Sequence, residues 1–238
     1  MTQPTQHREP HDRGVNQRLN WLRAGVLGAN DGIVSTAALV VGVAGATSAT
    51  AAIFTAGMAG LVGGAVSMAL GEYVSVSSQR DTERALIEKE RRELRDMPAA
   101  ELEELAELYR ERGLSERTAR AVAEELTAHD ALSAHLEAEL GIDQDDLVSP
   151  WQAALSSAIS FTIGALLPLL AILLPPEPWR IPVTFVAVLA ALAATGAVSA
   201  HLGDAPKLRA ALRLVIGGAL ALTATLLLGT LLGTTGIG

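Results

Sequence analysis

Carboxylate and thioether side chains lie at helical spacings along residues 60–93, where an apolar, glycine-rich segment runs into a highly charged one. Met68 and Glu72 are four residues apart, and Glu90 and Glu93 are three apart, so each pair shares one face of a helix. Carboxylates bind divalent cations, and a thioether adds a soft ligand for a transition metal. The stretch therefore predicts one helix that carries ligand-type groups from a membrane out into water.

Asp31 is the most informative single residue, because it is a carboxylate inside an apolar segment. A charged side chain at the centre of a membrane helix costs about 2.5–3.5 kcal/mol on insertion scales, so it normally serves an ion path or a polar partner. The simpler alternative places Asp31 near the interface, capped by Asn30 or paired with Arg23. Glu72 has the same alternative as an interfacial glutamate, and Met68 alone would be ordinary packing.

A second group of carboxylates recurs at helical spacing in the charged part of the chain. Its candidate metal ligands are Glu90, Glu93, Glu101, Glu104 and Glu139. Clustered carboxylates on facing helices hold di-metal centres in helix bundles. Glutamate-rich helices are also common as solvated faces, and this is the simpler interpretation of these residues alone. His129 and His135 are expected to be exposed helix residues.

Charge is strongly segregated along the 238 residues. Of the 26 acidic residues, 20 lie between Asp81 and Asp146, whereas the apolar segments on either side hold almost none. This pattern predicts a membrane protein with a charged insertion. The net charge of −8 disfavours nucleic acid as a partner. Cysteine is absent, which excludes disulfides and thiolate metal sites, so a metal must be held by oxygen, imidazole or thioether.

Several apolar segments reach the roughly 20 residues that a membrane-spanning helix needs. The expected spans are 21–45, 51–78, 152–174, 181–201 and 209–235. We therefore expect an all-α polytopic membrane protein with five transmembrane helices and an insertion between the second and third. The expected domains are a disordered tail over 1–20, helices one and two over 21–78, a glutamate-rich domain over 79–150, and helices three to five over 151–238.

The insertion is predicted to contain three helices. The first continues the second span to about Arg95, before Pro98, because proline disfavours helix in the residue that precedes it. The second covers about 99–112 and ends at Gly113, a residue suited to a left-handed cap. The third begins after Ser115 as N-cap and runs to about 140. Leu102, Leu105, Leu108 and Tyr109 form an apolar stripe on the second helix, which predicts a small bundle.

Basic residues indicate the orientation. They gather before the first span, in the insertion, and around the connection between the last two spans, while only Arg180 falls on the other side. The positive-inside rule then places the N-terminus and 79–150 in the cytoplasm and the C-terminus outside.

Two motifs extend these observations to a family. GANDGIVS in the first span, SMALGEYVSVSSQRD in the second and the glutamate-rich insertion closely resemble the vacuolar iron transporter family, over about residues 18–235. The resemblance implies a dimeric exchanger that moves Fe²⁺, and sometimes Mn²⁺, out of the cytoplasm against protons, with no permanent cofactor. Asp31, Met68 and Glu72 would line the path, and the five glutamates would bind metal. We expect it in the lipid of a bacterial inner (plasma) membrane.

Two other functions compete with this one. The first is a membrane-anchored di-iron carboxylate (ferritin-like) enzyme. The insertion helices have no Glu-x-x-His pair, so this alternative is only weakly supported. The second is a scaffold whose acidic bundle binds a basic partner, and it leaves Asp31 and Met68 unexplained.

Overall fold

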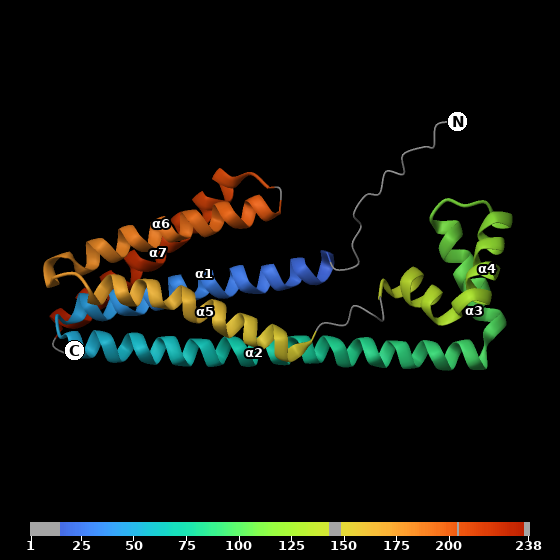
Figure 1. Cartoon of the computed structure of the whole chain (residues 1–238), viewed down its shortest axis with the longest axis horizontal. Helices are drawn as coiled ribbons and strands as arrows, with labels where there is room; N and C mark the ends of the chain where they lie inside the picture. The colour runs from blue at the N-terminus through green and yellow to red at the C-terminus, as the bar shows by residue number, and fades with distance from the viewer. Residues whose placement is uncertain (1–14, 143–148, 204, 236–238) are drawn as a thin grey trace, which may run out of the picture. The chain divides into compact units, whose positions relative to one another are not determined.

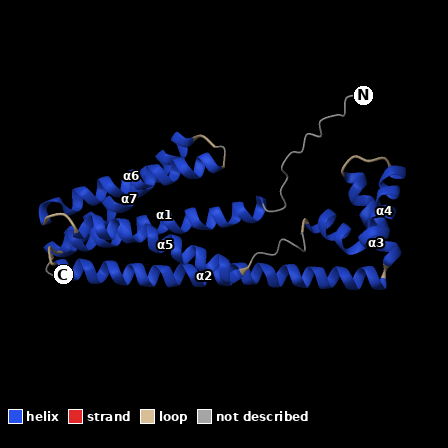
Figure 2. Cartoon of the chain, in the orientation of Figure 1, coloured by secondary structure: helices blue, strands red, loops and turns tan. Residues whose placement is uncertain are grey.

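The computed structural model describes residues 15–142, 149–203 and 205–235, so residues 1–14 of the expected disordered tail lie outside the described residues. Residues 15–20 are helical, so the expectation of disorder is wrong for this part of the tail. Within these ranges the chain is helical apart from short connections (Figure 2). The elements are α1 (Val15–Ala46), α2 (Thr50–Asp96), α3 (Pro98–Glu111), α4 (Glu116–His135), the π-helical turn η1 (Leu136–Leu140), α5 (Pro150–Leu173), the 3₁₀ turn η3 (Glu177–Trp179), α6 (Arg180–Leu202) and α7 (Lys207–Thr234) (Figure 1).

Among the described residues, five helices are long and apolar enough to cross a membrane, as predicted. They lie within Gly25–Ala46, Thr50–Asp96, Pro150–Leu173, Glu177–His201 and Lys207–Thr234. At 47 residues α2 is about twice the length that a bilayer requires. Apart from Glu72, the charged residues of α2 run from Arg80 to Asp96, so the spanning part is the apolar portion before them.

The chain divides into two compact units, and α2 contributes to both. One unit, here called the apolar unit, comprises Arg18–Tyr73 and Pro150–Gly238. The other, here called the acidic unit, is formed by Val74–Ser149.

Helix α1 contributes much of the core of the apolar unit. Ile33, Ala37, Val40 and Val41 on this helix are buried, and they belong to one cluster with buried residues from α2, α5, α6 and α7. Leucines and isoleucines on the outer faces of α5 and α7 are exposed instead, as a lipid-facing surface requires. Helices α6 and α7 run side by side (Figure 1).

Glycines let α1 approach α5 and α7 closely. A Cβ atom added at Gly32 would overlap the carbonyl oxygen of Phe161 on α5, and one at Gly164 would overlap the carbonyl of Ala29. On α7, a Cβ at Gly229 would overlap the carbonyl of Gly42. Small residues at such crossings allow membrane helices to pack by van der Waals contact. The spacing Gly28-x-x-x-Gly32 is thus explained by helix packing.

Gly32→Ala should destabilise the apolar unit, because the new methyl group meets backbone atoms of Phe161 that cannot rotate away. Overpacking of this kind costs about 1–3 kcal/mol. Thermal unfolding of the detergent-solubilised protein measures the loss. Gly217→Ala on α7 is the control, since a Cβ there meets no atom within 4 Å. If both variants unfolded at similar temperatures, helices α1 and α5 would be able to move apart at this crossing without loss of stability.

Helices α3 and α4 pack together in the acidic unit through small side chains. Leu105 and Ala106 on α3 and Ala123 and Ala134 on α4 are buried in one cluster. The partly buried residues against it include Leu102, Leu108 and Tyr109, so the predicted stripe on the second insertion helix does face a core. On α4 the buried side chains of this cluster are alanines, and Leu126 packs against them partly buried.

The ends of α3 and the start of α4 agree with the local sequence signals. Gly113 has a φ of 97° and follows α3 in the left-handed conformation that glycine adopts without strain. The Ser115 hydroxyl accepts a hydrogen bond from the Thr118 backbone N–H at 3.3 Å, as an N-cap does. These signals fix the connection between the two helices.

The expectation of one regular helix from Ser115 to about residue 140 is wrong. Asp130 has non-helical angles, with a φ of −159° and a ψ of 94°. Its carboxylate accepts a hydrogen bond from the Ser133 backbone N–H at 3.1 Å, so it caps the helical segment that follows. That segment then widens into the π-helical turn η1 and stops at Gly141, whose φ is 63°. The break and the turn change the face on which residues 131–140 lie.

Candidate functional site

A cavity of about 210 Å³ lies within the apolar unit between α1, α2 and α5. Its lining residues are Asp31, Ser35, Thr36, Leu39, Gly60, Gly64, Ser67, Met68 and Phe161. The two lining glycines leave this space open. A Cβ at Gly64 would overlap the Phe161 ring, and a Cβ at Gly60 would overlap the Leu39 side chain. The structure therefore brings Asp31 and Met68 to one cavity from two different helices.

The cavity presents oxygen and sulfur atoms to its interior. Thr36 is 1 % exposed, and within the described ranges its hydroxyl has no hydrogen-bond partner. The Ser35 hydroxyl donates to the Asp31 backbone carbonyl at 2.6 Å. Asn30, the suggested cap for Asp31, has its side-chain oxygen engaged by the Thr195 hydroxyl of α6 at 2.7 Å. Glu72 is half-buried one turn beyond Met68 and is not among the lining residues.

The acidic unit contains a second cluster, formed by three ionisable side chains that are almost fully buried. Glu90 on α2 is 2 % exposed, Glu101 on α3 is 4 % exposed, and His135 at the end of α4 is 0 % exposed. Glutamates are almost never this buried unless they are paired or bind a metal. The expectation that His135 is an exposed helix residue is therefore wrong, whereas His129 is exposed as expected.

These side chains approach one another around a common point. His135 Nδ1 lies 3.0 Å from Glu90 Oε1 and 3.8 Å from Glu101 Oε2. Ligand atoms of Glu90, His135 and Glu139 all lie within 4.8 Å of one another. Despite the short distance, His135 Nδ1 and Glu90 Oε1 are not aligned as a hydrogen bond. The His135 nitrogen and the Glu90 oxygen thus converge without a hydrogen bond between them, an arrangement that a cation would complete.

Burial and mutual repulsion shift the pKa values of the cluster. Burial, followed by the charges of Glu139 and Glu101, raises the pKa of Glu90 to about 7. Burial is also the main cause that raises the pKa of Glu101 and of Glu139. Burial lowers the pKa of His135, which keeps its imidazole neutral. A neutral imidazole and carboxylates that repel one another favour a divalent cation as the missing partner.

The two other predicted glutamates lie at the edge of this cluster. Glu93 is half-buried and accepts a hydrogen bond from Lys89 Nζ at 2.7 Å. Glu104 is exposed, but its charge raises the pKa values of Glu90, Glu101 and Glu139. The structure thus brings the five predicted glutamates into one neighbourhood, with Glu90, Glu101 and Glu139 closest to His135.

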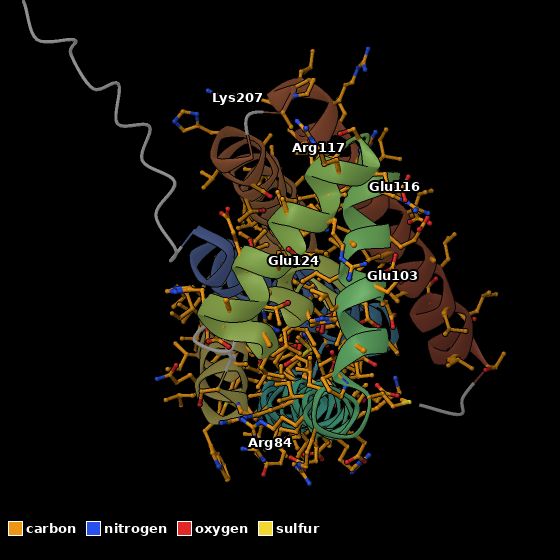
Figure 3. The ribbon with its side chains drawn as sticks, turned by 90° about the vertical axis from the view of Figure 1, so that its right-hand side faces the viewer. Arg84, Glu103, Glu116, Arg117, Glu124 and Lys207 are labelled. Carbon is orange, nitrogen blue, oxygen red and sulfur yellow. The ribbon has the colours of Figure 1, made fainter. Side chains whose placement is uncertain are left out.

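Other glutamates of the acidic unit form ordinary surface pairs. Glu103 on α3 and Glu124 on α4 are labelled in Figure 3. Both pair with Arg120, and all three side chains are about half exposed. Such pairs contribute little to stability, at about 0–1 kcal/mol. Glu116, also labelled in Figure 3, is exposed at the start of α4. The buried cluster is therefore distinct from the solvated glutamate face that the sequence also allowed.

Comparison with known proteins identifies the family. The model of the VIT family matches residues 22–230, which include the cavity and the buried cluster. This chain belongs to the VIT family. The resemblance found in the GANDGIVS and SMALGEYVSVSSQRD motifs is thereby confirmed, and with it an integral membrane protein.

Individual VIT-family relatives match over most of their length. The vacuolar iron transporter of Acanthamoeba castellanii is 46 % identical over 212 residues, which cover 89 % of this chain and 78 % of the relative. Vacuolar iron transporter homolog 1 of Oryza sativa subsp. japonica is 38 % identical, covering 92 % and 78 %. VIT-like transporter 1b of Glycine max is 35 % identical, covering 93 % and 80 %. These relatives are named as transporters, which contradicts the di-iron enzyme alternative.

His135 is the residue of this VIT-family chain that sequence reasoning missed. The spacing from Ser115 onward predicts a regular helix, on which His135 would face solvent. The signal that could have located it is Asp130, a good N-cap residue three positions before Ser133. Arg112 adds a second constraint, since its guanidinium donates to the Ala138 carbonyl of η1 at 2.6 Å.

Proposed function

We propose that this VIT-family protein transports Fe²⁺ across a membrane, through the cavity that Asp31 and Met68 line. The observation that carries the proposal is the meeting of these two side chains, from α1 and α2, in one polar cavity among apolar spans. A carboxylate inside a membrane is retained where an ion path needs it. The naming of VIT-family relatives as iron transporters supports iron as the ion.

The cavity suits a divalent transition metal. Asp31 supplies negative charge, the hydroxyls of Thr36 and Ser67 supply further oxygens, and Met68 supplies a soft thioether sulfur. Mixed oxygen and sulfur ligation favours Fe²⁺ over Mg²⁺ or Ca²⁺, which prefer oxygen alone. Glu72, one turn from Met68 toward the charged part of α2, would attract the ion to this path.

The acidic unit would collect metal before transport. Glu90, Glu101 and Glu139 concentrate negative charge around a buried point, and Glu93 and Glu104 extend that field outward. Carboxylates alone would accept Mn²⁺ as well as Fe²⁺. Protonation of the same carboxylates would release the metal, so a proton gradient would drive exchange.

The distribution of basic residues supports export from the cytoplasm. By the positive-inside rule the N-terminus and the acidic unit face the cytoplasm and the C-terminus lies outside. We place the protein as a homodimer in a bacterial inner membrane, where the acidic unit would meet cytoplasmic metal. The segregation of charge along the chain supports a division into 21–78, 79–150 and 151–238.

Purified protein in proteoliposomes tests this function directly. Fe²⁺ is kept reduced under anaerobic conditions. We expect it to cross the bilayer faster when a pH gradient drives protons in the opposite direction, because each proton that enters a carboxylate site releases metal. Metal flux is followed with an entrapped chelating dye, and proton flux with a pH-sensitive dye. Liposomes without protein are the control.

Iron flux that is unchanged by collapse of the pH gradient would remove proton exchange from the proposal. Absence of protein-dependent iron flux under every gradient would overturn the transport function itself.

A further inference from the structure

We propose that His135 is a metal ligand whose imidazole makes the acidic-unit site prefer Fe²⁺, Co²⁺, Ni²⁺ and Zn²⁺ over Mn²⁺ and Mg²⁺. The inference deepens the proposed function and rests on it in one respect, namely that the ion bound here is the transported ion. It concerns equilibrium binding, so it can be tested apart from transport.

His135 is built into the site like a ligand. Its side chain is completely buried, and among the residues that the structure describes neither ring nitrogen has a hydrogen-bond partner. Nearly all buried polar atoms in proteins have such a partner, so two open nitrogens require an explanation. Glu90 Oε1, which faces His135, is likewise buried without a hydrogen bond. A cation between them would satisfy both side chains at once.

The distances fit a single ion. Two neighbouring ligands of an octahedral ion at about 2.1 Å lie about 3.0 Å apart, and His135 Nδ1 lies 3.0 Å from Glu90 Oε1. The third donor, from Glu139, lies within 4.8 Å of these atoms. Opposite ligands of such an ion are about 4.2 Å apart, so a small side-chain movement completes the set.

Local structure holds His135 at this point. Asp130 interrupts α4 and caps the segment that ends at His135, and the π-helical turn η1 carries Glu139 directly after it. Single π-helical turns occur frequently at functional sites. Arg112 ties η1 to the end of α3 through the Ala138 carbonyl. The imidazole and the Glu139 carboxylate therefore reach Glu90 from one short, braced segment.

The nitrogen changes which ions the site prefers. Carboxylate oxygens suit Mg²⁺, Ca²⁺ and Mn²⁺, whereas imidazole suits Fe, Ni, Cu and Zn. For nitrogen-containing sites, affinity rises from Mn²⁺ through Fe²⁺, Co²⁺ and Ni²⁺. His135 among Glu90, Glu101 and Glu139 therefore converts a site that would accept Mn²⁺ into one that discriminates against it.

Competition binding with Co²⁺ and Mn²⁺ to the full-length protein in detergent tests the proposal. All samples carry Asp31→Asn, so that the cavity of the apolar unit contributes little. We expect His135→Gln to weaken Co²⁺ binding by at least about tenfold, since even the loss of a residue that only supports a ligand costs about 10–100-fold. Mn²⁺ binding should weaken clearly less. His129→Gln, at the exposed histidine of the same helix, should change neither affinity.

Equal losses for Co²⁺ and Mn²⁺ in His135→Gln, or no loss for either, would overturn the proposal. A second measurement uses protein that retains His135, so a folding defect of the His135→Gln variant cannot affect it. Pulsed EPR of the Mn²⁺-loaded protein at saturating metal should detect ¹⁴N coupling from a coordinated imidazole. Its absence would overturn the assignment of His135 as ligand, while iron flux in proteoliposomes would still decide the transport function independently.

Discussion

Asp31→Asn should abolish metal transport while leaving the protein folded and inserted in the membrane. The substitution preserves the size of the side chain and removes its charge, so the cavity between α1, α2 and α5 keeps its shape but loses its anionic ligand. Residues that merely support a metal site cost about 10–100-fold when removed, and loss of a charged ligand should cost at least about 100-fold in flux. Membrane insertion should not suffer, because charge inside a bilayer is unfavourable.

Iron flux into proteoliposomes, normalised to the amount of inserted protein, measures the effect. Glu116→Gln is a matched control, since it removes one carboxylate charge from an exposed position of α4 (Figure 3). Flux near the wild-type rate in Asp31→Asn would exclude this residue from the path. Equal losses in both variants would show a general effect of net charge.

The sequence predicts the membrane architecture well because each span is a local signal. Hydropathy and length identify every one of the five helices independently of the others. The end of α3 at Gly113 and the start of α4 at Ser115 are equally local, since one residue supplies the backbone conformation or the cap. By contrast, no spacing within one helix can show that Asp31 and Met68 share a cavity. That depends on how α1 packs on α2, which Gly60 and Gly64 determine together with Phe161.

The composition of the buried cluster is predicted only in part, for a related reason. Glutamates three residues apart on one helix must share a face, so Glu90 with Glu93 and Glu101 with Glu104 follow from periodicity. His135 does not, because Asp130 breaks the helix five residues earlier and η1 widens the next turn. Helical periodicity predicts which residues share a face only within one unbroken helix, and His135 lies beyond the break at Asp130.

The contribution of Glu90 should make the metal-free protein less stable as the pH rises from about 5 to about 8, while the lowered pKa of His135 contributes in the opposite direction. The pKa of Glu90 is raised from its usual 4.5 to about 7 in the folded protein. A carboxyl with a raised folded-state pKa favours folding when it is protonated. Its contribution is fully present below 4.5 and is lost as the pH rises through about 7. The difference corresponds to at most about 3 kcal/mol.

A bound divalent cation should reverse this trend. Once Glu90, Glu139 and His135 hold a metal, the ionised form of Glu90 becomes the favoured one, and the repulsion among the carboxylates is offset. At a free metal concentration of about 100 times the Kd, binding adds about 2.7 kcal/mol to the stability of the folded state. The gain should therefore be large at about pH 8 and small at about pH 5, where protons compete with the metal for the same oxygens.

Glu90→Gln separates these effects in the full-length protein. The amide imitates the protonated carboxyl, so the metal-free variant should unfold at a higher temperature than the wild type at about pH 8, and its pH dependence should be smaller. The variant should also lose the stabilisation by Fe²⁺, measured anaerobically by thermal unfolding in detergent. The double variant Glu116→Gln and Glu124→Gln should retain both properties of the wild type, because these two carboxylates are exposed and Glu124 is paired with Arg120. If that double variant responded as Glu90→Gln does, the metal effect would belong to the acidic surface in general, and the buried cluster would have no special role.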